Sequence, residues 1–75
     1  MAHRHHALTA FGSNLRSERE RKNLTQEKLA EKADLDPSYI SGIERGIRNP
    51  SILSVVRIAK AMGTTVSDLS RGIEG

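Results

Sequence analysis

Small and cationic side chains share one face of the segment that ends at Arg45. If the segment is helical, that face carries Ser38, Ser41, Gly42 and Arg45. Ile40 and Ile43, three residues apart, fall on the other side, where a core would take them. A face without bulky groups permits close approach to another surface, and a net charge of +3 favours a polyanionic one. The pattern predicts a helix that packs on one side and binds on the other.

Gly42 has two explanations. Glycine inside a helix costs about 1 kcal/mol relative to alanine. Either a ligand or another backbone approaches closely here, or the fold tolerates the loss.

A second short helix precedes this one and is joined to it by a polar corner. Thr25 can cap its first turn, and the expected buried face consists of Leu29, Ala30 and Ala33. After the corner, Asp36 can cap the next helix, and Pro37 suits its first position because the missing N–H costs nothing there. We expect that helix over residues 37–45, ended by a left-handed Gly46. Together the two helices predict a helix-turn-helix.

Three flanking helices would hold this pair in place. Apolar spacing predicts a helix over residues 9–22, with Asn23 as a left-handed stop. Ser51 would cap a strongly apolar helix that ends at Gly63. A short last helix would begin after Thr65. The fold class is therefore all-α, with a flexible tail over residues 1–8, a domain over 9–72 and a C-terminal tail over 73–75.

Composition narrows the functional classes. A chain of 75 residues is at most one domain, and the absence of cysteine excludes a disulfide scaffold and a cysteine nucleophile. No apolar run approaches the roughly 20 residues that span a bilayer. His3, His5 and His6 could hold a metal ion weakly, but a tail or an expression remnant explains them better. We therefore expect neither an enzyme nor a cofactor, membrane or small-molecule partner, and a cytoplasmic location.

Several short motifs resemble one family. They are Thr25-Gln26, Leu29-Ala30, the run from Tyr39 to Gly46, and the run from Arg48 to Ser51. The chain resembles the XRE/Cro-type helix-turn-helix regulators from about Phe11 to Leu69. The stretch YISGIERGIRNPS most resembles the controller proteins of restriction–modification systems.

The resemblance implies a compact five-helix, lambda-repressor-like domain that binds double-stranded DNA as a two-fold dimer. It places a phosphate contact at Gln26, for which the alternative is a solvated first-turn glutamine. Its base-facing positions fall on Pro37, Ser38, Ser41 and Gly42. Pro37 and Gly42 have no side chain that can read a base edge. Reading would then fall to Ser38, Tyr39 and Ser41, with Arg45, Arg48 and Asn49 near the DNA backbone. Tyr39 could equally be a half-buried core ring.

The resemblance also implies an ion pair between Arg19 and Glu44, which would tie the first helix to the recognition helix. For the dimer interface we expect Met62, Val66 and Leu69, with Ile73 as a further candidate. The alternative is that these residues complete the core of the monomer.

The main hypothesis is thus a transcriptional regulator, such as a repressor, that binds a near-palindromic operator as a homodimer. Two other classes remain open. One is an antitoxin whose DNA binding is secondary to a protein partner. The other is a protein-interaction module of the same fold, which the absence of base-reading groups at Pro37 and Gly42 would favour.

Overall fold

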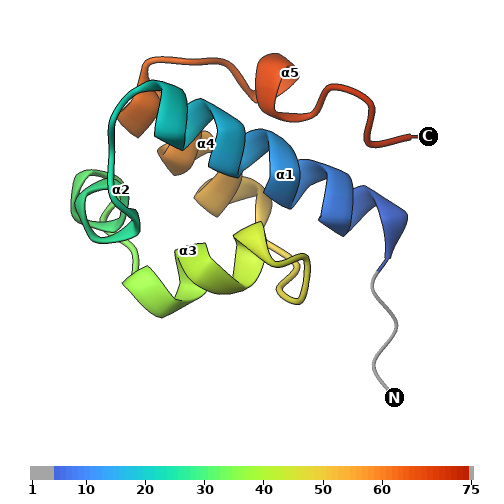
Figure 1. Ribbon diagram of the computed structural model, residues 1–75, viewed down its shortest axis with the longest axis horizontal. Coiled ribbons are helices and arrows are strands. Elements are labelled where there is room, and N and C mark those ends of the chain that lie inside the picture. Colours follow the sequence, from blue (N-terminus) through green and yellow to red (C-terminus); the bar gives the residue numbers. More distant parts are fainter. Residues whose placement is uncertain (1–4, 75) are drawn as a thin grey trace.

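The computed structural model describes residues 5–74, and across them the chain is helical without strands. The helices are α1 (His6–Arg21), α2 (Gln26–Ala33), α3 (Pro37–Glu44), α4 (Ile52–Met62) and α5 (Val66–Leu69). In Figure 1, α1 lies across the centre of the molecule, α3 runs beneath it, and α2 stands end-on at one side. The predicted all-α fold with a helix-turn-helix at α2 and α3 is confirmed.

The helix-turn-helix is bounded by the expected caps. The Thr25 hydroxyl accepts the Lys28 N–H at 3.0 Å, and the Asp36 carboxylate accepts the Ser38 N–H at 2.8 Å. Gly46 has the left-handed backbone expected after α3, with φ of 75°. The corner also needs a left-handed residue at Asp34, where φ is 58°. Aspartate adopts that conformation more readily than most residues, so the turn closes without a glycine.

The predicted boundaries of α1 and α3 are off by a few residues. The first helix begins at His6 rather than residue 9, so residues 6–8 of the expected tail are helical. The third helix ends at Glu44, and Arg45 is its C-cap. His3 and Arg4 lie outside the described residues, whereas His5 and His6 are exposed. Within residues 5–74 there is no group of acidic and histidine side chains that could hold a metal ion.

One aliphatic core joins all the helices. Its fully buried side chains are Leu15, Leu29, Ile40, Ile43, Ile58 and Leu69. Helix α3 therefore buries both isoleucines, as the three-residue spacing predicted. Among the described residues, every helix is too short or too polar to cross a bilayer.

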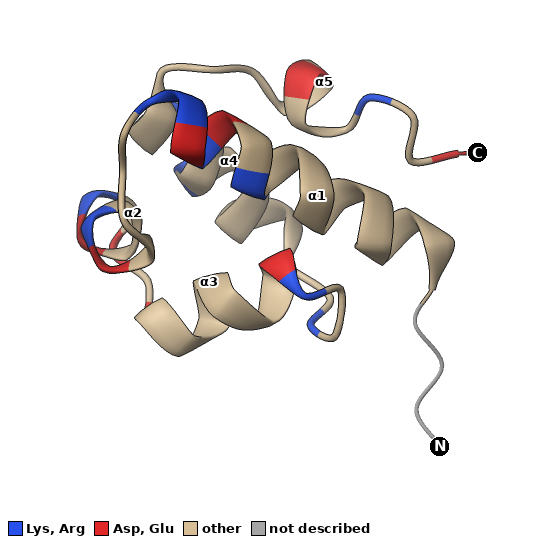
Figure 2. Cartoon of the chain, viewed as in Figure 1, with Lys and Arg blue, Asp and Glu red and all other residues tan. Residues whose placement is uncertain are grey.

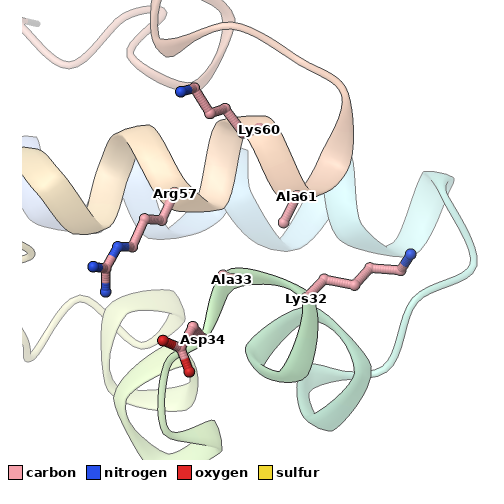
Figure 3. Close-up of a pocket in the computed structure, with 6 residues that line it drawn as sticks. All are labelled: Lys32, Ala33, Asp34, Arg57, Lys60 and Ala61. Atoms are coloured by element: carbon pink, nitrogen blue, oxygen red, sulfur yellow. The ribbon is translucent and has the colours of Figure 1, made fainter.

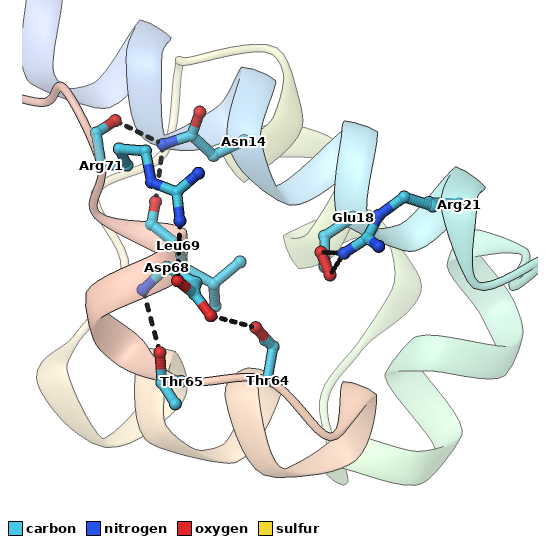
Figure 4. A network of polar contacts seen from close by, with 8 residues as sticks. All are labelled: Asn14, Glu18, Arg21, Thr64, Thr65, Asp68, Leu69 and Arg71. Carbon is cyan, nitrogen blue, oxygen red and sulfur yellow. Dashed lines mark hydrogen bonds and ion pairs between the residues drawn. The ribbon is translucent and has the colours of Figure 1, made fainter.

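Two features of α1 position its neighbours. A Cβ on Gly12 would lie 2.3 Å from the Ile43 carbonyl oxygen, so only glycine lets α1 and the end of α3 approach this closely. On another side of α1, the Asn14 amide donates to the carbonyl oxygens of Leu69 and Arg71, each at 2.8 Å (Figure 4). These two bonds satisfy carbonyl groups at the end of α5 that the short helix leaves open.

Candidate nucleic-acid interface

The exposed side of α3 begins with small side chains. Pro37 and Ser38 are exposed and Ser41 is half-buried, so these three positions present no long side chain. The Ser38 hydroxyl donates to the Asp36 carboxylate at 2.6 Å. That bond, with the Ser38 N–H, lowers the pKa of Asp36 below its ordinary value. Because its proton is already engaged, Ser38 can offer a base edge an acceptor rather than a donor.

Gly42 serves contacts within the chain. It is buried, and a Cβ there would lie 2.3 Å from the Cγ of Arg48. Neither of its two explanations holds as stated, because the group that approaches closely is the side-chain stem of Arg48 and not a ligand or another backbone. Our expectation that Gly42 itself faces DNA is wrong, because Arg48 covers it. The glycine instead makes a notch in which Arg48 lies.

Tyr39 and Arg48 form a stacked pair beside that notch. The Arg48 guanidinium lies 5.4 Å from the centre of the Tyr39 ring, within the range of a cation–π contact. The Tyr39 hydroxyl accepts the backbone N–H of Ser51 at 3.2 Å, and hydrogen bonds from Ser54 and Ser51 lower the pKa of Tyr39. Tyr39 packs against the core and is half-buried. Of its two expected roles, the structure supports the half-buried one.

Arg19 and Glu44 form the expected ion pair. The Arg19 Nε and Nη2 atoms donate to the two Glu44 carboxylate oxygens at 2.6 and 3.0 Å. Only 11% of the Arg19 side chain and 3% of the Glu44 side chain is exposed. The hydrogen bonds to Glu44 raise the pKa of Arg19, which keeps the guanidinium charged. This two-pronged geometry ties the end of α3 to α1.

Gln26 joins the same pair. Its Nε2 donates to Glu44 Oε1 at 3.0 Å, so the side chain is neither freely solvated nor wholly directed outward. Sequence reasoning missed this bond, because Gln26 and Glu44 are 18 positions apart and nothing in their spacing indicates a contact. Gln26 is the first residue of α2 and directly follows its cap, Thr25.

Ion pairing differs along the chain. In Figure 2 the charged positions gather on the second half of α1, on α2 and just after α3, while most of α3 is uncharged. Arginines of α1 pair with glutamates: Arg16 with Glu20, Arg19 with Glu44, and Arg21 with Glu18. Arg45 and Arg48 are exposed and form no ion pair within residues 5–74. Two arginines that no carboxylate neutralises among the described residues therefore stand just after α3.

A second set of cations surrounds a hollow of about 380 Å³ between α2 and α4. Its lining consists of Lys32, Ala33, Asp34, Arg57, Lys60 and Ala61. Figure 3 shows the three cationic side chains directed away from one another around the two alanines. Lys32 and Lys60 lie in the last turns of their helices, where a cation offsets the helix dipole. This arrangement has an explanation inside the fold, and α3 contributes nothing to it.

The expected dimer residues separate into two groups. Met62 and Leu69 are 4% and 1% exposed, so they belong to the core and the expectation that they form a dimer surface is wrong. Val66 is 40% exposed. It lines a largely apolar groove of about 260 Å³ together with Leu8, Asn49, Ile52 and Ile73. Asn49, which we expected near the DNA backbone, thus lines this groove.

Comparison with known proteins places the chain in a family. The helix-turn-helix family model matches residues 15–69. The control protein C.BamHI of Bacillus amyloliquefaciens is 47% identical over 60 residues, covering 79% of this chain and 74% of the relative. The control protein C.MunI of a Mycoplasma species is 42% identical over 65 residues, covering 85% and 88%. The crystal structure of the restriction–modification controller protein C.AhdI from Aeromonas hydrophila matches with a TM-score of 0.81 and 42% identity, covering 83% of this chain and 94% of that one.

Proposed function

This chain belongs to the helix-turn-helix family of DNA-binding transcriptional regulators, and we propose that it binds a near-palindromic operator as a homodimer. The first turns of α3 enter the major groove, where Ser38 and Ser41 meet base edges. Arg45, Arg48 and Asn49 contact the DNA backbone on one side of the groove, and Gln26 contacts a phosphate at the start of α2.

The observation that carries this proposal is the pair of arginines just after α3 that form no ion pair within residues 5–74. Arg45 and Arg48 stand beside a surface of small side chains, whereas the arginines of α1 pair with glutamates. Phosphate groups supply the missing anions, and small side chains let the helix approach the groove floor. Because few side chains remain to read bases, DNA shape and deformability supply part of the specificity.

A second copy of the chain is proposed to cover the start of α4. Ile52 and Leu53 are 81% and 59% exposed there, and Val66 of α5 lies beside the same groove. Apolar side chains this open are typical of a surface that a partner covers. Two copies related by a two-fold axis would place their recognition helices about 34 Å apart, one turn of DNA.

The operator and the dimer can be tested together. Sites are selected from a random DNA pool and the enriched sequence is examined for two-fold symmetry with half-sites about 10 base pairs apart. Sedimentation then gives the mass of the free and bound protein. An Ile52→Asp variant should bind as a weaker, monomeric species, while Lys60→Asp at the other end of α4 should still dimerise. Enrichment of asymmetric single half-sites would contradict the homodimer.

The arginine contacts have their own test. Arg45→Ala and Arg48→Ala should weaken binding to all sequences alike and lower the slope of log affinity against log salt by about one each. Lys60→Gln removes a cation that lies on the α2–α4 hollow and serves as the matched control. A change in base preference at an unchanged salt slope would contradict the phosphate role.

An antitoxin remains the second candidate, because the same fold can combine DNA binding with a protein partner. The exposed apolar start of α4 would then be covered by a different protein. Sedimentation of the pure chain at micromolar concentration separates the two, since an antitoxin that needs its partner for this surface would stay monomeric on its own.

A further inference from the structure

We propose that Glu44 is a positioning residue for DNA binding, because its buried carboxylate holds the Gln26 amide in the orientation that a phosphate contact needs. The inference rests on the proposed phosphate contact of Gln26. It assigns to the polar cluster of Arg19, Gln26 and Glu44 a task beyond tying helices together.

The cluster joins three helices at one carboxylate. Glu44 Oε1 accepts both Gln26 Nε2 and Arg19 Nη2 at 3.0 Å, while Oε2 accepts Arg19 Nε at 2.6 Å. The remaining guanidinium nitrogen, Arg19 Nη1, donates to the Leu24 carbonyl oxygen at 2.7 Å. Leu24 directly precedes Thr25, the cap of α2. The first turn of α2 is therefore fixed twice, through a backbone carbonyl before it and through the side chain of its first residue.

The chemistry of the carboxylate decides which way the amide faces. An ionised carboxylate only accepts hydrogen bonds, so it binds the NH₂ group of Gln26 and not the carbonyl oxygen. One N–H of that group is used by Glu44, and the second forms no hydrogen bond within residues 5–74, which leaves it for a phosphate oxygen. Without Glu44 the amide could rotate and present its oxygen, which repels a phosphate. A fixed side chain also loses less conformational entropy on binding than a free one.

Arg19 completes the arrangement by balancing charge. A lone carboxylate 3.0 Å from Gln26 Nε2 would repel a phosphate approaching the same amide. The two hydrogen bonds from Arg19 compensate this charge. Gln26 can then donate to Glu44 and to DNA together.

The experiment must separate the positioning of Gln26 from the contribution of Glu44 to stability. Removing Glu44 alone leaves a buried Arg19 without its partner and would destabilise the fold. Replacing both members of a buried ion pair with apolar residues often preserves stability. The double variant Arg19→Met/Glu44→Met is therefore compared with Gln26→Ala and with the triple variant. Arg16→Met/Glu20→Met changes an exposed ion pair on α1, 3.2 Å long, and is the matched control. Circular dichroism selects a temperature at which every variant is folded.

The readout is the effect of single neutral methylphosphonate groups placed along the selected operator. We expect one phosphate in each half-site at which the neutral group weakens wild type by about tenfold, as the loss of a hydrogen bond to a charged group would. At that position Gln26→Ala and Arg19→Met/Glu44→Met should both lose the effect, while Arg16→Met/Glu20→Met keeps it. Adding Gln26→Ala to the double variant should change affinity less than threefold.

Two results would overturn the inference. The first contradicts the positioning role of Glu44 alone, and the second contradicts the proposed phosphate contact of Gln26 as well. If the folded double variant keeps the full tenfold effect at the phosphate that Gln26→Ala ignores, Glu44 does not position Gln26. If no phosphate distinguishes wild type from Gln26→Ala, the Gln26 contact within the proposed function is wrong, and the positioning role falls with it.

Discussion

The two ends of α3 are held in the protein by different means. At the start, Asp36 caps the helix and Pro37 and Ser38 stand exposed, with hydrogen bonds only to neighbouring residues. At the end, the Glu44 side chain is tied to α1 and α2, and the backbone rests against Gly12. The last turn of α3 is thus tied to α1 and α2 by charged and amide side chains, whereas at its start Pro37 and Ser38 stay exposed and the bond to another helix is the one that Tyr39 makes to the cap of α4.

This difference bears on how the helix can recognise DNA. The exposed arginines and the polar cluster of Arg19, Gln26 and Glu44 lie at the end of α3. Both suit contacts with phosphate groups, which every DNA sequence shares. The open end carries small side chains that allow approach but offer few hydrogen bonds to a base. Under the proposed function, the last turn of α3 would hold the DNA backbone, and its first turn would approach the bases with few groups that can read them.

The strongest test of the anchored end is Glu44→Ala. It would leave Arg19 largely buried without its carboxylate, and breaking such a pair costs about 3–5 kcal/mol. Thermal or urea unfolding measures the loss. Ser38→Ala, at the start of α3, is the control variant. It should lower the free energy of unfolding by much less than Glu44→Ala does. Equal costs at the two ends would remove the distinction between them.

Gly42→Ala tests whether the notch under Arg48 matters for binding. Alanine favours the helix by about 1 kcal/mol, but its Cβ would displace the Arg48 stem from its place beside Tyr39. We expect a stability change near zero and an operator affinity reduced by about tenfold, the scale of a cation–π and phosphate contact together. In an Arg48→Ala background the same change should leave affinity unaltered. A further loss there would mean that Gly42 acts on DNA directly.

Sequence reasoning predicted the parts of this molecule that depend on local rules. The caps at Thr25, Asp36 and Ser51 and the burial of Ile40 and Ile43 follow from spacing and residue type, and they are all found. The Arg19–Glu44 pair came from the family resemblance, since no local pattern links these positions.

The predictions were wrong at positions where local spacing does not determine which other part of the chain a residue contacts. Met62 and Leu69 face inward while Ile52, in the same apolar pattern, is 81% exposed, because helix periodicity does not say which part of a wide apolar face the other helices cover. Gly42 was placed at DNA because the sequence cannot show that Arg48 folds back over it. The sequence places Arg48 six positions after Gly42, and this spacing does not predict a contact between them.

A smaller effect is expected from Tyr39→Phe, which probes the link between α3 and α4. Phenylalanine keeps the ring beneath Arg48 but loses the hydroxyl that accepts the Ser51 N–H. The expected loss of stability is about 1 kcal/mol. Because Ser51 caps α4 next to Ile52, we also expect weaker discrimination between operators whose half-site spacing differs by one base pair. Gel shifts with operators of different half-site spacing measure this discrimination. If it is unchanged, Tyr39 does not influence the dimer through Ser51, and its remaining role is the contact with Arg48.

The smallest effect concerns the pH dependence of the open end. The Ser38 hydroxyl and N–H lower the pKa of Asp36, so the folded state favours the ionised carboxylate. This contribution to stability is fully present above the unfolded pKa of about 3.9 and disappears as pH falls through the lower folded value. Asp36→Asn keeps a cap that does not titrate. Unfolding free energies measured from pH 6 to below pH 4 should therefore show wild type losing slightly more stability than Asp36→Asn, with the difference confined to the acidic end. A constant difference across that range would mean that the cap acts through its shape alone, and the open end of α3 would then be independent of charge.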